Sequence, residues 1–259
     1  SGVMAIKKYD CIVVGGGLSG LFSAYLIASL GNVSVALFEK GSEMDDRNPD
    51  VPGDHLSGIG GAGTLSGGKL CKYPSSGQIW ELTGNDLSTW NLFINKLPLS
   101  HIHKELLYSY DSNTTFLSKI ENGLTHKRYT STPLLKDQMR EFIKGFCSLN
   151  NMVGVETHTG YELINIAREN NAYTLSFNNA NEGLIATATT VIVATGRTSA
   201  GCLGEILTST GVAVFEQSPD LGVRIEMPKG SSSHFQHLGQ DIKIKSKVGS
   251  IGMRTFCVC

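Results

Sequence analysis

Three glycines near the N-terminus, Gly15, Gly17 and Gly20, have the G-x-G-x-x-G spacing of a phosphate-binding turn. In such a turn Gly15 permits a tight bend and Gly17 lets the backbone approach a pyrophosphate. Gly20 allows the following helix to pack closely on a strand. Leu18 and Ser19 open that helix, whose free N–H groups attract phosphate oxygens. This spacing predicts a site for the diphosphate of a dinucleotide.

An acidic residue follows at the position that such a site requires. Glu39 ends the apolar run Val33–Phe38, about 20 residues after the glycines. A carboxylate there accepts hydrogen bonds from the ribose hydroxyls of an adenosine. Lys40, directly after it, joins the candidate binding residues. A glycine-rich loop before a packed helix is the structural alternative, but the order strand, glycines, helix, strand and acid favours dinucleotide binding.

The elements that must position these residues predict an α/β fold. Residues 9–14 read as a buried parallel strand, the glycines open an apolar helix, and 33–38 form a second strand. A long Gly/Ser/Asp/Pro-rich loop, 41–77, follows and is expected to be functional because ordinary loops are far shorter. Helices are expected at 86–97, 104–110, 132–146 and 200–208, the third opened by Thr132 as N-cap and Pro133.

Short strand-like runs separated by Asn and Gly fill the second half of the chain. They are residues 154–158, 161–167, 173–177 and 183–187. The first is expected to be a third parallel strand, and the others predict an antiparallel meander. Residues 190–194 then read as a further buried strand that stops at Thr195-Gly196. Strand-like runs return after Val223.

This order of elements, with the Gly15–Gly20 turn, Glu39 and the segment Thr190–Gly196, resembles the FAD-binding domain of the glutathione-reductase-like flavoproteins. The segment Gly58–Leu70 is similar to a signature of a poorly characterised group of bacterial FAD-dependent dehydrogenases. Leu65 and Gly67 stand where that group has Phe and Asp. The resemblance implies a Rossmann-like FAD-binding domain with a parallel sheet, helices and an antiparallel meander. It also implies the start of a second, β-rich domain that is mostly missing.

The resemblance also implies contacts with FAD. By it, the backbone of Val155 contacts adenine, although strand packing is an equally good account of that residue. The segment that runs close to FAD contains three candidates, Ala194, Thr195 and Gly196. Within the segment Gly58–Leu70, five residues are expected to offer backbone and hydroxyl donors to the pyrophosphate or to the edge of the flavin: Gly61, Ala62, Gly63, Thr64 and Ser66. The alternative is that this segment is only a flexible loop. Lys69 either places positive charge near a phosphate or the flavin, or is a solvated surface lysine.

Composition narrows the class of protein. The formal net charge is -1, from 22 Lys+Arg and 23 Asp+Glu among 259 residues, which argues against nucleic-acid and membrane partners. The N-terminus lacks a signal-peptide pattern, and the six scattered cysteines predict no disulfide framework, so a cytoplasmic protein is expected. A metal or redox role for Cys257 and Cys259 is the weaker alternative, because no further ligands lie near them. No metal site and no catalytic residues are predicted.

The dinucleotide-binding pattern and the resemblance to flavoproteins together predict an FAD-dependent oxidoreductase. Such an enzyme moves hydride between an organic small-molecule substrate and flavin. Residues 1–220 are expected to form the FAD-binding domain, with a helical insert at 86–130. Residues 221–259 are expected to start a truncated substrate domain, so a second polypeptide or a missing C-terminal part would complete the enzyme. The alternatives are a non-catalytic FAD-binding fragment or subunit of a split flavoprotein, and a tRNA-modifying flavoprotein.

Overall fold

The structure is a computed structural model that describes residues 6–65, 67–71, 84–97, 99–100, 103–105, 118–121, 124–128, 131–215, 221–223, 228 and 242–255. The chain divides into two compact units. The first contains residues 1–68 and 134–217, and the second contains residues 69–133 and 218–259. The expected domain boundary between residues 220 and 221 stays a prediction.

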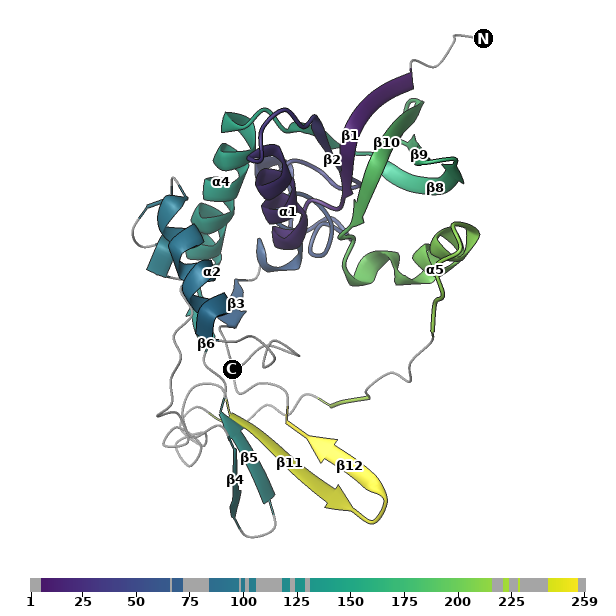
Figure 1. Cartoon of the computed structure of the whole chain (residues 1–259). Coiled ribbons are helices and arrows are strands. Elements are labelled where there is room, and N and C mark those ends of the chain that lie inside the picture. Colours follow the sequence, from purple (N-terminus) through teal and green to yellow (C-terminus); the bar gives the residue numbers. More distant parts are fainter. Residues whose placement is uncertain are drawn as a thin grey trace. The chain divides into compact units, whose positions relative to one another are not determined.

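A six-stranded sheet forms the centre of the first unit, in the order β7-β2-β1-β10-β9-β8 (Figure 1). Four strands are parallel: β7 (Glu156–Thr159), β2 (Val35–Glu39), β1 (Ile6–Val14) and β10 (Gly183–Val193). Two continue it in antiparallel fashion: β9 (Ala172–Asn178) and β8 (Glu162–Glu169). The predicted α/β fold, with a parallel sheet and a meander, is confirmed.

One strand was divided wrongly by the sequence pattern. The runs 183–187 and 190–194 were expected as two strands, but β10 continues unbroken from Gly183 to Val193. Its first half pairs with β9 on one side, and most of its length pairs with β1 on the other. The two residues between these runs, buried Ala188 and exposed Thr189, therefore mark no turn and lie within a continuous strand.

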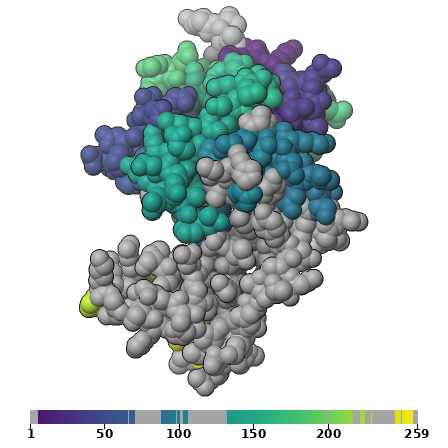
Figure 2. Space-filling view, turned by 90° about the vertical axis from the view of Figure 1, so that its left-hand side faces the viewer, coloured from purple at the N-terminus to yellow at the C-terminus, as the bar shows by residue number. Residues whose placement is uncertain are grey.

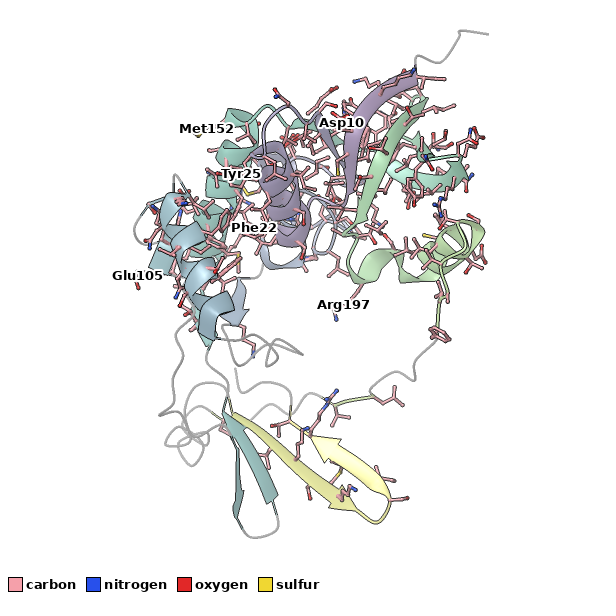
Figure 3. The ribbon with its side chains drawn as sticks, in the orientation of Figure 1. Asp10, Phe22, Tyr25, Glu105, Met152 and Arg197 are labelled. Atoms are coloured by element: carbon pink, nitrogen blue, oxygen red, sulfur yellow. The ribbon has the colours of Figure 1, made fainter. Side chains whose placement is uncertain are left out.

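Two helices pack against each other in this unit. α1 (Leu18–Ala28) and α4 (Lys136–Met152) meet through Phe22 and Phe146, whose ring centroids lie 5.5 Å apart. Phe22 is labelled in Figure 3. The buried amide of Asn150 donates to the carbonyl of Leu21 at 2.9 Å, which fixes the register of the pair. Figure 2 shows part of α4, coloured teal, at the surface of this unit.

The start of α4 differs from the prediction at Thr132-Pro133. Residues Ser131–Leu134 form β6, which pairs with β3 (Gly68–Cys71), and the helix begins at Lys136. In a two-stranded ribbon both strands are edges, where a proline is tolerated. The N–H of Leu135 donates to Oε1 of Gln138 at 2.9 Å and so stabilises the later start. A third helix, α5 (Ala200–Ser209), agrees with the prediction.

An aromatic cluster covers the face of the sheet that lies beneath the meander. Phe38 on β2 is fully buried and stacks on Phe177 of β9, with ring centroids 4.1 Å apart. Strands β1 and β10 separate β2 from β9 in the sheet, so the sheet curls until the meander covers its own parallel part. Phe38 also stacks on His158 of β7 at 4.6 Å.

His158 gives this cluster a pH dependence. Burial, reinforced by the charge of Lys7, lowers the pKa of His158 below its ordinary 6.5, although Glu156 opposes the shift. The unfolded chain therefore binds more protons than the folded chain, and the free energy of unfolding should fall as the pH drops below about 6.5. His158→Phe keeps the stacking and should remove part of this fall, as measured by urea unfolding from pH 7 to about pH 5. The same change at exposed His55 is the matched control; an unchanged pH profile for His158→Phe would contradict the assignment.

The second unit combines α2 (Gly84–Lys96) with a four-stranded antiparallel sheet in the order β12-β11-β5-β4. Its strands are β4 (Ser118–Glu121), β5 (Leu124–Arg128), β11 (Ile242–Val248) and β12 (Ile251–Arg254). The insert expected to be helical at 86–130 therefore also contains strands, β4 and β5. The sequence pattern did not predict them, because β5 pairs with β11, more than 100 residues later in the chain. Of the helix expected at 104–110, only residues 104–105 are described.

Candidate dinucleotide-binding site

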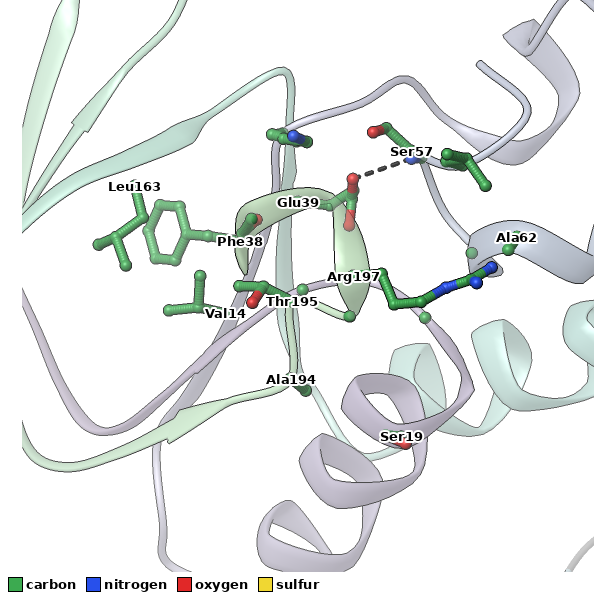
Figure 4. Close-up of a pocket in the computed structure, with 18 of the residues that line it drawn as sticks. Val14, Ser19, Phe38, Glu39, Ser57, Ala62, Leu163, Ala194, Thr195 and Arg197 are labelled. Atoms are coloured by element: carbon green, nitrogen blue, oxygen red, sulfur yellow. Dashed lines mark hydrogen bonds between the residues drawn. The ribbon is translucent and has the colours of Figure 1, made fainter. Parts of the chain in front are cut away.

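A cavity of about 330 Å³ opens at the carboxyl ends of the parallel strands in the first unit (Figure 4). Ligands of open α/β sheets bind at this edge. Its wall comes from the glycine turn, the end of β2, the loop 56–63, the start of β8, the end of β10 and α5. The lining residues include Gly15, Gly17, Leu18, Ser19, Glu39, Lys40, Gly61, Ala62, Gly63, Tyr161, Leu163, Ala194, Thr195, Gly196 and Ile206.

The first wall is the amino end of α1. Gly17 is the N-cap, no side chain caps the helix there, and its first turn holds no acidic residue. The positive end of the helix dipole and its first N–H groups are therefore available to an anion in the cavity. A Cβ on Gly17 would meet only the Cα of Gly61, at 4.0 Å, so the protein leaves this position open.

The other two glycines of the turn have packing roles. Gly15 has a φ of 109°, and a Cβ there would lie 2.4 Å from the carbonyl oxygen of Ala194. A Cβ on Gly20 would lie 1.8 Å from the carbonyl oxygen of Gly15. Both glycines therefore bring strand and helix together, as their spacing predicts, while Gly17 faces the cavity.

Glu39 forms the second wall, and its carboxylate is already engaged with the backbone. Oε2 accepts the N–H of Gly16 at 2.6 Å, and Oε1 accepts the N–H groups of Gly41 and Gly58 at 2.8 and 2.9 Å. The side chain is only 6% exposed. A carboxylate has about four lone-pair sites, so Oε2 retains capacity for one further donor. Glu39 thus holds three segments of chain together as well as facing the cavity.

The third wall is the segment Gly58–Gly63, called here the glycine wall. The N–H of Gly60 donates to the carbonyl of Gly16 at 2.8 Å, and Gly60 forms a parallel bridge with Gly17. Gly60 and Gly61 have φ values of 93° and 71°, a conformation that only glycine adopts without strain. The glycine wall is thereby seated directly against the amino end of α1.

The remaining wall follows β10 and reaches α5. Ala194, Thr195 and Gly196 continue β10, and the N–H of Ala194 donates to the carbonyl of Val14 at 2.7 Å. Arg197 is exposed and points toward Ala62 in Figure 4. Apolar lining is added from Val14, Phe38, Leu163, Leu203 and Ile206. This cavity therefore has a polar, glycine-rich part and an apolar part.

Most of the candidate residues predicted from the sequence meet at this cavity, and a few do not. Gly20, Thr64 and Val155 are buried beside it and do not line it. The hydroxyl of Thr64 donates to the carbonyl of Gly61 at 3.0 Å, and Val155 packs in the core. Lys69 belongs to the second unit. Ser66, Cys257 and Cys259 lie outside the described residues.

Sequence reasoning missed two groups of residues. Tyr161, Glu162 and Leu163 were assigned to a meander strand alone, yet they line the cavity because β8 starts beside the end of β2. Arg47 was not noticed, since a single arginine in a polar loop usually lies at the surface. It is 5% exposed and donates to the carbonyls of Asp54, Ile59 and Gly61.

Removing the negative charge of Glu39 should destabilise the fold. In Glu39→Gln, an amide NH₂ replaces one carboxylate oxygen and faces an N–H donor at Gly16 or at Gly41 and Gly58. At least one buried donor then lacks an acceptor, so the free energy of unfolding should fall by about 2 kcal/mol. Urea unfolding measures the change, with Glu162→Gln as the control, because Glu162 also lines the cavity but is exposed. Equal stabilities of both variants would contradict the structural role of Glu39.

None of the helices in the described parts of the chain has the length and apolar character needed to cross a membrane. In the same residues, no group of three or more His, Cys, Asp or Glu side chains is placed to hold a metal ion.

Known proteins were compared with this chain by sequence and by structure. No curated protein matches the chain. A geranylgeranyl bacteriochlorophyll reductase-like protein from Thermoplasma acidophilum is similar in structure, with a TM-score of 0.43 and 17% identity over 76% of this chain and 41% of that one. A flavoprotein/dehydrogenase from Cytophaga hutchinsonii has a TM-score of 0.44 and 13% identity, covering 78% and 42%. For p-nitrophenol 4-monooxygenase PnpA from Pseudomonas putida the values are 0.44 and 14%, covering 78% and 44%.

This chain therefore spans less than half the length of each of these three proteins. The family model described as an NAD(P)-binding Rossmann-like domain matches residues 13–44, which run from the end of β1 through α1 to the turn after β2. The matched part contains the glycine turn and Glu39, and the first unit has a Rossmann-like α/β fold.

Proposed function

We propose that this chain binds FAD and forms the FAD-binding part of a flavin-dependent oxidoreductase related to the glutathione-reductase-like flavoproteins. The observation that carries the proposal is that the uncapped amino end of α1, Glu39, the glycine wall and the end of β10 meet at one cavity. A diphosphate at the helix end would gain the helix dipole and backbone N–H groups. The curled antiparallel meander beside a parallel sheet favours FAD over a nicotinamide cofactor.

The described residues fit the adenosine diphosphate half of FAD. Gly17 leaves open the space that any side chain would fill, which suits a close approach of the pyrophosphate. Oε2 of Glu39 has capacity for one ribose hydroxyl in addition to the N–H of Gly16. The apolar part of the cavity, with Leu163 and Ile206, suits the adenine ring.

When bound, FAD supplies the redox chemistry, in which hydride passes between an organic substrate and the flavin. The residues of this chain would bind and orient the cofactor, and no catalytic residue is assigned among them. Because the chain spans less than half of the similar proteins, we propose that further polypeptide, on this chain or on a second one, completes the substrate site. A chain that only binds FAD is the alternative within this proposal.

The identity of the cofactor is tested first on protein purified without added nucleotide. Heat release followed by chromatography should yield FAD, or the apoprotein should bind added FAD with a perturbed flavin absorption spectrum. Recovery of nicotinamide nucleotide alone, with no binding of FAD, would contradict the proposal.

The position of the cofactor is tested on Cys202, which is exposed and lines the cavity. Its thiol should react with an alkylating reagent in the apoprotein and be protected when FAD is bound. Peptide mapping by mass spectrometry separates Cys202 from the other five cysteines of the chain. Cys147, which does not line the cavity, is the internal control. Equal labelling of Cys202 with and without bound FAD would place the cofactor elsewhere.

A further inference from the structure

Among the described residues, the buried charged side chains are Glu39 and Arg47. Glu39 belongs to the dinucleotide motif, whereas Arg47 lies in the loop after β2 and belongs to no motif. Burial lowers the pKa of its guanidinium, and the charges of Glu39 and Asp54 oppose that shift. A buried cation costs desolvation free energy, so its position calls for a physical explanation.

The hydrogen bonds that the structure shows for Arg47 all go to main-chain carbonyls. Nη1 donates to the carbonyls of Ile59 and Gly61 at 3.0 and 2.9 Å, and Nε donates to the carbonyl of Asp54 at 3.0 Å. Nη2 also donates to Asp54. The planar fork of the guanidinium thus holds three carbonyls of one loop, a geometry that lysine cannot reproduce.

These bonds determine how the glycine wall is presented to the cavity. Because a trans peptide unit is planar, its C=O and N–H point in opposite directions. The unit that turns the carbonyl of Ile59 toward Arg47 therefore turns the N–H of Gly60 away from it, and that N–H donates to the carbonyl of Gly16 in the glycine turn. Gly61 and Ala62 both line the cavity, and Gly61 lies against Gly17 at the amino end of α1.

A second observation ties the glycine wall to the same side chain. Gly58 has a φ of 109°, and a Cβ there would lie 2.6 Å from Cδ and 2.9 Å from Nε of Arg47. The N–H of Gly58 donates to Glu39 on its other side. One short segment is therefore held between the buried carboxylate and the buried guanidinium.

We propose that Arg47 is a positioning residue for the diphosphate of the dinucleotide, acting through the glycine wall. By holding the carbonyls of Ile59 and Gly61, it fixes the backbone of the glycine wall where Gly60 and Gly61 line the cavity, and it places a positive charge behind that backbone. An anion in the cavity would in turn favour the buried charge of Arg47. The inference rests on the proposed function, because it requires a diphosphate ligand in this cavity.

Three probes separate recognition of the diphosphate from overall stability: FAD, ADP and adenosine, which lacks phosphates. In Arg47→Met, calorimetric titration should show ADP and FAD bound about tenfold more weakly or worse, because a charged group no longer supports their site. Adenosine affinity should change little. A merely structural role would lower the melting temperature and leave the ratio of ADP affinity to adenosine affinity unchanged. Arg47→Lys, which keeps the charge without the fork, should fall between parent and Arg47→Met.

The outcomes distinguish the two proposals. A parent protein that binds neither FAD nor ADP refutes the proposed function. A parent that binds both, together with a folded Arg47→Met variant that keeps the parent's affinity ratio, overturns the role of Arg47.

If Arg47→Met does not fold, the ratio of ADP affinity to adenosine affinity is measured for Gly58→Ala against Gly53→Ala. Gly53 has a φ of 98° and open space around it, so both variants share the backbone strain while only Gly58→Ala presses on Arg47. Equal ratios in this pair likewise overturn the inference.

Discussion

Replacing Gly20 by alanine is expected to lower the free energy of unfolding by about 3 kcal/mol, a large share of the stability of a typical domain. The added methyl group would lie 1.8 Å from the carbonyl oxygen of Gly15, which is backbone and cannot rotate away. To relieve this clash, α1 must move off β1, and the buried contacts of Leu21 and Ala24 would loosen. Urea unfolding followed by circular dichroism measures the loss.

Gly201→Ala is the matched control for this prediction. Gly201 lies in α5, and a Cβ there would meet no atom within 4 Å. The same substitution should therefore stabilise the protein by up to about 1 kcal/mol, through the higher helix propensity of alanine. If both variants unfold at the same urea concentration as the parent, the close approach at Gly20 is not essential to the fold.

Replacing Gly17 by valine should abolish detectable binding of FAD, a loss of at least about 100-fold, or about 2.7 kcal/mol. The valine side chain would occupy the part of the cavity beside Gly17 that we assign to the pyrophosphate. The fold should survive, because Gly17 has φ -70° and ψ 177°, which any residue adopts, and the nearest atom to a new Cβ is 4.0 Å away. Titration with FAD, followed by flavin fluorescence, measures the loss.

Gly17→Ala extends the same test with a smaller side chain and should weaken binding less than valine does. Thermal unfolding of both variants should match the parent, in contrast to Gly20→Ala. If Gly17→Val binds FAD as tightly as the parent, the pyrophosphate does not lie at this turn and the proposed site is wrong.

The sequence predicted the part of the fold in which local pattern and tertiary structure agree. The first strand, the glycine turn, α1, β2 and Glu39 follow one another in a short stretch, and each shows a clear local signal. The start of α4 was misjudged because Thr132-Pro133 is equally compatible with an edge strand, and its partner β3 lies about 60 residues earlier in the sequence. Pairing over such distances leaves no local trace.

The candidate site was predictable to the same extent. The residues that approach the cavity with their backbone were found, since glycine spacing records a backbone requirement. The second role of Glu39 was not found, because its partner Gly58 is fixed only when the loop returns to β2. Arg47 was overlooked for the same reason: its carbonyl partners at Asp54, Ile59 and Gly61 follow no periodic pattern.

The continuity of β10 has a consequence for how the two sides of the cavity fluctuate. Paired with both β1 and β9 from Ile185 to Ala188, and with β1 as far as Val193, β10 should open only when the whole unit unfolds, so its central amide hydrogens should exchange slowest with solvent. Thr195 and Gly196 directly continue that strand. The glycine wall belongs to no named strand and is held by separate hydrogen bonds to Glu39, to Arg47 and to the carbonyl of Gly16. We therefore expect exchange to be faster there, and a ligand to enter by local opening on that side while the β10 side stays closed.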